Sequence, residues 1–497
     1  MLIGNFLVVG LRSKILRRLQ RLLHLLRELV DTHKSPSAIA PRASNALLSK
    51  DFARSKLAPA HCSFNAPRVS VLAMSAEEKW IGYRALALLR PGAFRRYIVG
   101  SAISDTGTWM QVMAQGWVMS ALTNKAILLG MANFAAGIPT LALTMYGGSV
   151  ADRFDKRKIL IATQIAQILL AVGLGWLVLA GRIQIWHILC FAALLGISIA
   201  FEMPAISALV PELVRRDEIA AAVAMDRSVF HGSRLVGPSL AGLFIGWWGA
   251  ASAFFANAFS FLALIIALIS LPPRIKGTAE EEEQRRSGIM DGFRYVRSDR
   301  TILSMIALIA CTTIFVFPTI SVMLPLYVRS ILQLGPRELG WLMAVSGTGA
   351  FSGSLGLLTI ARDKRLRFMS GNVLGIALGM FFMSRSHSFL LTACSMGILA
   401  IALSMNFGLA NTIVQEHAPP ELRGRVSAVF GLSFFGLMPI AGLVVTGFSD
   451  LVGMRSALAV ASVIYGITAF AVLSLAGRHV CDRPIAPTPE PELTSVA

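Results

Sequence analysis

Charged residues are scarce in this chain. Only 15% of its 497 residues are Asp, Glu, Lys or Arg, and 55% are hydrophobic, whereas about 25% charged residues is usual for a soluble protein. The apolar residues fall in long blocks, and no segment has the alternating strands of about 10 residues that build a membrane barrel. Because a bilayer core offers no water to backbone groups, each block must form a helix. The composition therefore predicts an all-α membrane protein.

Cysteine is also sparse, and catalytic motifs are missing. The five cysteines include no C-x-x-C pair, and three lie inside apolar blocks, so we expect neither a disulfide framework nor a zinc site. The sequence contains no G-x-S-x-G nucleophile elbow, H-E-x-x-H metal motif or Walker-type phosphate loop. We therefore expect no enzyme activity, no metal, no cofactor and no ATP-driven pumping.

Twelve mostly apolar blocks lie between Tyr97 and Gly477, each close to the roughly 20 residues that a helix needs to cross a bilayer. The first six span about 97–122, 126–146, 159–180, 186–210, 219–246 and 250–271. The last six span about 302–328, 338–360, 368–384, 389–415, 426–448 and 455–477. We predict two six-helix bundles, at 97–271 and 301–477, joined by a charged linker at 272–300. A lead-in at 74–96 precedes them, and a disordered tail follows at 478–497.

Residues 1–73 form a basic extension. Its stretch Leu11–Val30 has leucines at helical spacing among basic residues, which is typical of a helix on a membrane surface or of an organellar transit peptide. An over-extended gene start is a third interpretation, because Met74 opens a natural start, MSAEEKW. The extension holds twelve of the 46 Lys and Arg residues and three of the 27 Asp and Glu residues, so about half of the net charge of +19 belongs to it. No nucleic-acid motif accompanies this charge, and we expect no nucleic-acid partner.

Loop charges predict the orientation in the membrane. The loops at 152–158, 211–220, 272–300, 361–368 and 416–425 together hold 19 Lys and Arg residues, whereas the alternate loops hold 6. Basic loops stay in the cytoplasm. Both termini and the central linker are therefore expected to be cytoplasmic.

The two halves repeat a pattern. The loop after the second span contains Asp155-Lys156-Arg157, and Asp363-Lys364-Arg365 follows 208 positions later. Val210-Pro-Glu212 follows the fourth span, and Val414-Gln-Glu416 follows the tenth, 204 positions later. These offsets indicate a duplicated six-helix unit. Membrane transporters built from repeated helical units bind substrate near the midplane between their halves.

The loop from Gly148, GSVADRFDKRK, resembles the loop between the second and third helices of the major facilitator superfamily, G-x-x-x-D-R-x-x-[RK]-[RK]. The resemblance implies a conformational latch formed by Gly148, Asp152, Arg153 and Arg157. Asp152 would lie at a neighbouring helix N-terminus, where anions are favoured, and Arg153 would pair with a facing carboxylate. The second half keeps Gly356 but has no Asp-Arg pair, so the latch should be asymmetric.

Three other stretches are similar to the bacterial exporter branch known as transmembrane secretion effectors, which includes siderophore exporters and macrolide efflux pumps. They are SDTGTWMQVMAQGWVMSALT from Ser104, FEMPAISALVPELV from Phe201 and PPELRGRVSAV from Pro419. Gly237, Pro238 and Gly242 resemble the antiporter motif of the fifth helix, although other small residues replace its earlier glycines. The resemblance implies efflux driven by the proton gradient across the bacterial inner membrane.

Ionisable residues inside spans are few, and they concentrate in the first half. Such residues are costly in a membrane and usually face a cavity or a partner. Our hypothesis is that Asp105, Glu202 and Asp226 form the proton-coupling site, and that Arg234 biases one of them. A carboxyl group that alternates between a closed pocket and open water can load and release a proton. A structural ion-pair network without coupling is the alternative.

The spans of the second half are predicted to form an apolar cavity wall rich in Met and Phe. Opposite the acidic wall of the first half, this surface would suit an amphiphilic small molecule such as a drug or siderophore. The residues assigned to the substrate cavity are Gln111, Gln115, Phe315, Trp341, Asn406 and Asn411. We expect the protein to be a monomer, with the substrate and the lipid bilayer as its partners. A proton-coupled importer of a small metabolite and a transport-inactive receptor or scaffold remain alternatives.

Overall fold

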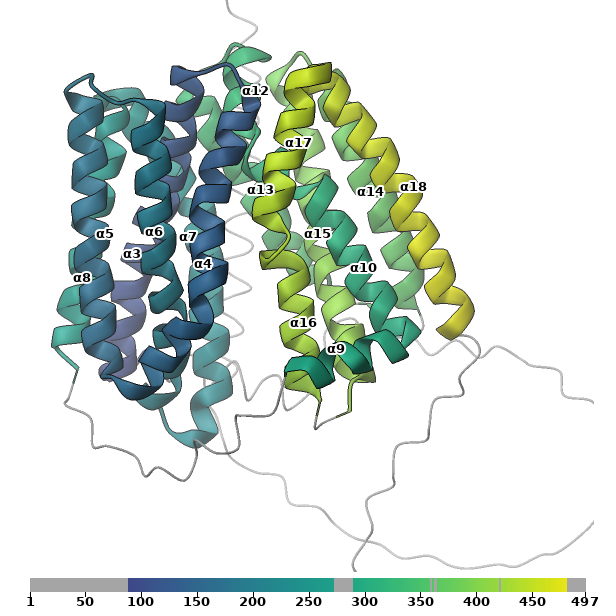
Figure 1. Ribbon diagram of the computed structural model, residues 1–497, viewed down its shortest axis with the longest axis horizontal. Helices are drawn as coiled ribbons and strands as arrows, with labels where there is room; N and C mark the ends of the chain where they lie inside the picture. The colour runs from purple at the N-terminus through teal and green to yellow at the C-terminus, as the bar shows by residue number, and fades with distance from the viewer. Residues whose placement is uncertain (1–87, 272–288, 358–359, 362–363, 420–421, 481–497) are drawn as a thin grey trace, which may run out of the picture. The chain divides into compact units, whose positions relative to one another are not determined.

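The computed structural model describes residues 88–271, 289–357, 360–361, 364–419 and 422–480, and this part of the chain is entirely helical outside its turns and loops. The extension at 1–73 and most of the predicted lead-in, linker and tail lie outside the described residues. Helix labels follow Figure 1.

The first half contains six long helices. They are α3 (Ala93–Leu122), α4 (Ala126–Arg153), α5 (Lys156–Leu179), α6 (Ile185–Leu209), α7 (Ile219–Trp248) and α8 (Ala250–Ile269), with the short 3-10 helices η1 (Val210–Leu213) and η2 (Arg216–Glu218) between α6 and α7. In α5, the Asp155 side chain caps the N-terminus by accepting a hydrogen bond from the backbone N–H of Arg157. The predicted spans of this half therefore correspond one to one with helices.

The second half repeats the order with interruptions. Its helices are α9 (Ile289–Ser298), α10 (Arg300–Phe315), α11 (Phe317–Ser321), α12 (Leu324–Ser330), α13 (Pro336–Gly356), α14 (Arg365–Arg385), α15 (Phe389–His417), α16 (Arg423–Phe435), α17 (Met438–Val452) and α18 (Met454–Val480). Pro318, Pro325 and Pro439 stand at the starts of α11, α12 and α17. Proline lacks the backbone donor that continues a helix, so the seventh and eleventh spans are broken. Within the predicted linker, α9 is a helix rather than a plain connection.

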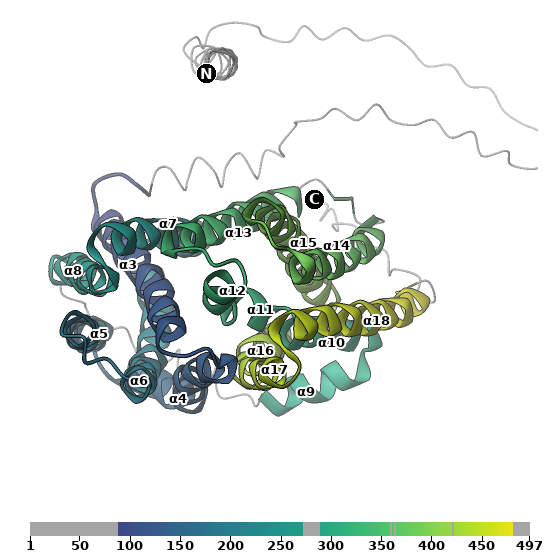
Figure 2. The ribbon, with the colours of Figure 1, turned by 90° about the horizontal axis from the view of Figure 1, so that it is seen from above.

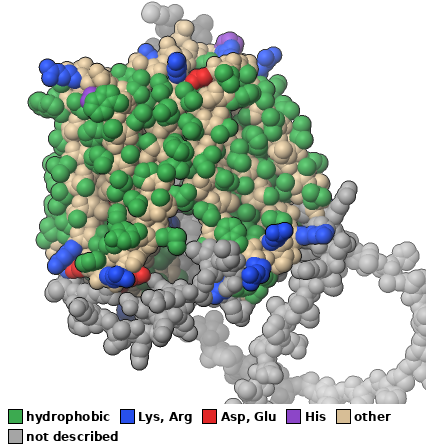
Figure 3. All heavy atoms as spheres, viewed as in Figure 1, with side chains coloured by type: hydrophobic (Ala, Val, Ile, Leu, Met, Phe, Trp, Pro, Cys, Tyr) green, Lys and Arg blue, Asp and Glu red, His purple; other side chains and the backbone are tan. Residues whose placement is uncertain are grey.

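Twelve crossing segments result. Among the described residues, eight helical segments are long and apolar enough to cross a membrane by length and composition. Three other long helices, α3, α7 and α13, carry more polar residues, and the twelfth segment is the broken run α10–α12. Apolar side chains cover the middle of the face shown in Figure 3, and Lys and Arg lie at its two ends. This is the all-α, twelve-helix architecture expected from the hydropathy.

The halves meet along two helix pairs. Within the first half α3 packs on α7 and α8, and α4 packs on α6; between the halves α7 packs on α13 and α4 on α17 (Figure 2). Glycines permit the close approach. A Cβ at Gly242 would lie 2.9 Å from the Pro336 carbonyl oxygen, and one at Gly130 would lie 2.9 Å from the Gly442 carbonyl oxygen.

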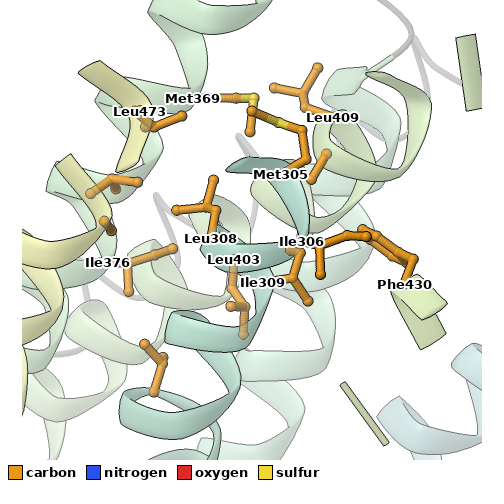
Figure 4. Packing of buried hydrophobic residues seen from close by; sticks show 14 of the residues in the cluster. Met305, Ile306, Leu308, Ile309, Met369, Ile376, Leu403, Leu409, Phe430 and Leu473 are labelled. Atoms are coloured by element: carbon orange, nitrogen blue, oxygen red, sulfur yellow. The ribbon is translucent and has the colours of Figure 1, made fainter. Parts of the chain in front are cut away.

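The two ends of these helices are packed differently. We call the end with the loops at 152–158, 210–218 and 364–367 the basic end, and the end with residues 123–125, 331–335 and 453 the opposite end. A core cluster that includes Met119 and Leu129 of the first half with Tyr327 of the second half joins the halves toward the opposite end. The other two clusters each belong to one half alone, that of the second half being shown in Figure 4. Among the described residues, the core cluster shared by the two halves therefore closes them against each other toward the opposite end.

Candidate functional site

Glu202 of α6 lies inside the first half, held by two glutamines of α5. Its carboxylate accepts hydrogen bonds from Gln164 Nε2 at 2.7 Å and from Gln167 Nε2 at 2.5 Å. Gln164 Oε1 in turn accepts a hydrogen bond from Ser104 Oγ of α3 at 3.2 Å. The sequence analysis did not select these two glutamines. Their spacing of three residues, which places both on one helix face, is the signal that could have pointed to them.

Of the other two carboxylates, Asp226 of α7 is hydrogen-bonded to α3, whereas Asp105 is hydrogen-bonded within α3. Tyr97 OH donates to Asp226 Oδ1 at 3.0 Å, and Asp226 is only 8% exposed. Ser101 Oγ donates to Asp105 Oδ2 at 3.1 Å. The structure therefore places Asp105, Glu202 and Asp226 in one half, each stabilised by neutral donors.

Arg234 lies over an aromatic ring. Its guanidinium carbon is 5.1 Å from the centroid of Trp109, which is within cation–π range. Phe230 packs edge-on against the same indole, with ring centroids 5.8 Å apart. Within the described ranges Arg234 has no ion pair with any of the three carboxylates. The structure thus gives no support to a direct effect of Arg234 on one of them.

The antiporter-like motif is a close-packing element. A Cβ at Gly237 would lie 2.6 Å from both the Thr106 carbonyl oxygen and Trp109 Cβ, so only glycine fits against α3. Gly242 meets α13 of the other half, and Pro238 lies inside the continuous helix α7. These residues hold α7 against both of its neighbours.

The described hydrogen bonds of the predicted latch residues lie within the first half. Asp152 and Arg153 are exposed, and a Cβ at Gly148 would meet nothing within 4 Å. Arg157 instead donates to the Leu268 carbonyl oxygen at 2.8 Å, which ties α5 to the end of α8. The latch itself stays a prediction.

Two ion pairs at the basic end reproduce the sequence repeat. Lys156 Nζ lies 3.0 Å from Glu212 Oε1, and Arg365 pairs with Glu416 at 2.8 Å. Each pair joins the loop after the second helix of its half to the end of the fourth. The duplication inferred from Val210-Pro-Glu212 and Val414-Gln-Glu416 is thus visible in matching contacts.

The opposite end has two polar contacts that cross between the halves, which sequence reasoning missed. Asp450 of α17 accepts hydrogen bonds from the backbone N–H groups of Ala126 and Ile127 at 2.7 and 2.9 Å, and so caps α4. Arg329 donates to the Ser120 carbonyl oxygen near the end of α3. Each charge complements the partial charge of a helix terminus.

Three of the residues assigned to the substrate cavity differ in their burial and contacts. Gln111 is only 4% exposed and accepts a hydrogen bond from Asn257 Nδ2 at 2.7 Å, so it joins α3 to α8. Asn406 is fully buried within the second half. Trp341 is 59% exposed. Thr348 and Leu355, which follow it at intervals of seven residues and so share its face of α13, are exposed as well. The cavity assignments of these three residues stay predictions, because helical spacing in the sequence does not tell which side of each helix faces inward.

The remaining three assignments are compatible with the structure but untested. Gln115 is partly buried, and Phe315 packs against the core of the second half. Asn411 Oδ1 accepts a hydrogen bond from Gln415 Nε2 at 3.2 Å.

The second half has a neutral counterpart of the Glu202 site. Asn406 follows Glu202 by 204 positions, and Asn372 follows Gln164 by 208, which are the offsets of the repeated loops. Both polar atoms of the Asn406 amide and the Nδ2 of Asn372 are buried without a hydrogen-bond partner. Among the described residues, no group of acidic, His or Cys side chains could hold a metal ion. Asp105, Glu202 and Asp226, the carboxylates inside the predicted spans, all belong to the first half.

Comparison with known proteins agrees with this architecture. The family model described as "Transmembrane secretion effector" matches residues 83–496. The multidrug efflux pump Tap of Mycolicibacterium fortuitum is 23% identical over 77% of this chain and 96% of its own length. The staphyloferrin A transporter of Staphylococcus aureus is 24% identical over 70% of this chain and 87% of its own. The solved nucleoside transporter NupG has a TM-score of 0.59 at 12% identity, covering 77% of this chain and 98% of that one, and so shows the same fold.

The family match covers most of the chain, and it confirms transport rather than catalysis as the activity class. The chain belongs to the transmembrane secretion effector family of major facilitator transporters.

Proposed function

We propose that this protein is a proton-coupled exporter of an amphiphilic small molecule in the bacterial plasma membrane, with its basic end and both termini in the cytoplasm. The observation that carries the proposal is the set of three carboxylates gathered in one half, on α3, α6 and α7. Ionisable groups at membrane depth usually serve ion or substrate movement. The multidrug efflux pump among the relatives supports export, and the staphyloferrin A transporter supports a small-molecule substrate.

Alternating access would then proceed from the observed packing. The halves are closed toward the opposite end, so the arrangement corresponds to a state open to the cytoplasm. Closing the basic end would carry Asp152 toward the N-terminus of α16, where exposed backbone N–H groups favour an anion. The Asp450 and Arg329 contacts at the opposite end would break in the same step.

Proton coupling would act through the carboxylates of the first half. Asp105 lies one helical turn from Trp109 on α3, whereas Glu202 and Asp226 are held by Gln164, Gln167 and Tyr97. A protonated carboxyl loses acceptor strength toward these donors, so proton loading would loosen contacts among α3, α5, α6 and α7. Proton binding and substrate binding would then each drive the same conformational change, but in alternate steps of the cycle, as antiport requires.

The test measures proton movement in proteoliposomes on addition of lipophilic drugs and siderophores. We expect wild-type protein to move protons with a transported ligand, and Glu202→Gln or Asp226→Asn to abolish this movement. Asp217→Asn, in the exposed η2 segment, is the control for the loss of one carboxylate and should retain the flux. Unchanged flux in both Glu202→Gln and Asp226→Asn would make the carboxylates structural.

Direction is tested separately in intact cells. An exporter lowers the accumulation of its ligand relative to cells without the protein, and an uncoupler restores it. Higher accumulation in the presence of the protein would instead establish the importer.

A further inference from the structure

Three basic side chains form a stripe along α7. Arg227, His231 and Arg234 follow one another at intervals of four and three residues, so they share one face of the helix. Arg227 is 47% exposed, and its nearest described carboxylate oxygen, on Asp226, is 4.0 Å away. Arg234 lies on the Trp109 ring without a carboxylate partner in the described ranges. The positive charges of this face are therefore poorly neutralised by the protein.

The stripe faces the space between the two halves. Gly237 marks the side of α7 that packs on α3, and Leu235, which packs against Gly347, marks the side that packs on α13. Arg234 falls between these two sides. Val236, two residues later and therefore about 200° around the helix, is a large exposed apolar residue suited to lipid. The stripe thus lies on the side of α7 away from lipid.

The nearby carboxylates do not offset this charge fully. Glu202 is bound by two glutamines, and Asp226 is bound by Tyr97 and is almost completely buried. Asp105 of α3 is partly exposed and accepts a hydrogen bond from Ser101. A partly desolvated guanidinium without a counter-ion is unfavourable, and the planar donor groups of Arg match an acidic group well.

Aromatic side chains accompany the stripe. Trp109 and Phe230 lie beside Arg234, with the Phe230 ring packed edge-on against the indole of Trp109. Aromatic side chains contribute large apolar contact areas to binding. A ligand with one acidic group and an apolar body would match both features.

We propose that the transported molecule is an anionic amphiphile, whose acidic group is bound by Arg234 and Arg227 and whose apolar body lies against Trp109 and Phe230. This inference rests on the exporter function proposed above and specifies its substrate class. A cationic amphiphile of the same shape would meet like charge along the stripe and would be disfavoured.

The test is equilibrium binding to the full chain in nanodiscs, with empty nanodiscs subtracted for lipid partition. The probes are 1-pyrenebutanoate and two molecules with the same pyrenylbutyl body, one ending in an ammonium group and one in a hydroxyl group. We expect the carboxylate to bind at least about tenfold more tightly than the ammonium probe, because hydrogen bonds to charged groups are among the stronger ones. Arg234→Gln should abolish this preference, and Arg234→Lys should keep part of it.

Arg182→Gln is the matched control, because it removes one positive charge from an exposed turn at the opposite end. This substitution should leave the preference for the carboxylate probe unchanged, which would show that the preference does not depend on the net charge of the protein alone. Equal or tighter binding of the ammonium probe, absence of carboxylate binding above empty nanodiscs, or an unchanged preference in Arg234→Gln would overturn the proposal. The assay needs no proton gradient, so its failure leaves proton-coupled export standing, and loss of proton flux in the earlier test leaves the charge preference standing.

Discussion

Replacing Asp450 should open the opposite end. In the structure its two carboxylate oxygens accept hydrogen bonds from the backbone N–H groups of Ala126 and Ile127 at 2.7 and 2.9 Å, across the boundary between the halves. Loss of an N-cap acceptor costs about 1 kcal/mol, and the interaction of a carboxylate with the helix terminus adds about 0.3–1 kcal/mol. Asp450→Ala should therefore destabilise the closed opposite end by about 1–2 kcal/mol, a shift of about 5- to 30-fold in the conformational equilibrium.

The assay is pulsed electron–electron distance measurement between spin labels at Arg182→Cys and Arg385→Cys, which are exposed positions at the opposite end of the two halves. The native cysteines are first replaced. We expect a longer-distance population to increase in Asp450→Ala and to increase less in Asp450→Asn, because an amide oxygen still caps a helix. Asp217→Ala, at the basic end, is the control. A distance distribution identical to that of the unsubstituted protein would refute the reasoning.

Three further predictions concern stability, measured as the melting temperature of purified protein in detergent. Gly237→Val should lower the melting temperature strongly or prevent folding, because a Cβ at position 237 would lie 2.6 Å from backbone and side-chain atoms of α3. Gly232→Ala, on the same helix, is the control: its added Cβ would meet nothing within 4 Å, so the variant should be neutral or slightly stabilised, and equal effects of the two substitutions would contradict the packing role. Asn406→Leu should raise the melting temperature, because a buried amide without partners costs about 1–3 kcal/mol; a decrease would mean that the amide is satisfied in the membrane. Lys156→Met and Glu212→Gln should each destabilise, and a double-mutant cycle should give a coupling of about 1 kcal/mol; purely additive effects would show that the pair contributes nothing.

The distribution of buried polar groups gives the two halves different tasks. The carboxylate of Glu202 has the neutral amide of Asn406 as its repeat-related counterpart, and the acids concentrate around α3, α6 and α7. In the proposed function, the first half carries the titratable groups and the second half supplies an apolar wall. The predicted latch is asymmetric in the same way, because its Asp-Arg pair, Asp152 and Arg153, is present only in the first half.

Hydropathy, loop charge and repeated motifs by themselves determined much of this protein. Each crossing segment is recognisable because a helix in a bilayer must bury its own backbone within about 20 residues, a local property that a sequence carries. The repeated Asp-Lys-Arg loops revealed the duplication, and the loop from Gly148 with the later stretches revealed the family. The ionisable residues Asp105, Glu202 and Asp226 could be selected because charge inside an apolar block is rare.

Only the tertiary structure decided what these residues contact. Gln164 and Gln167 reach Glu202, Asp450 caps α4, and Arg234 lies on Trp109 rather than beside an acid. Helical spacing places a side chain on a face, but the neighbour of that face depends on how segments from 35 to more than 300 positions apart pack together. For this reason Gln111 and Asn406, which look like cavity residues in the sequence, are buried between helices within one half.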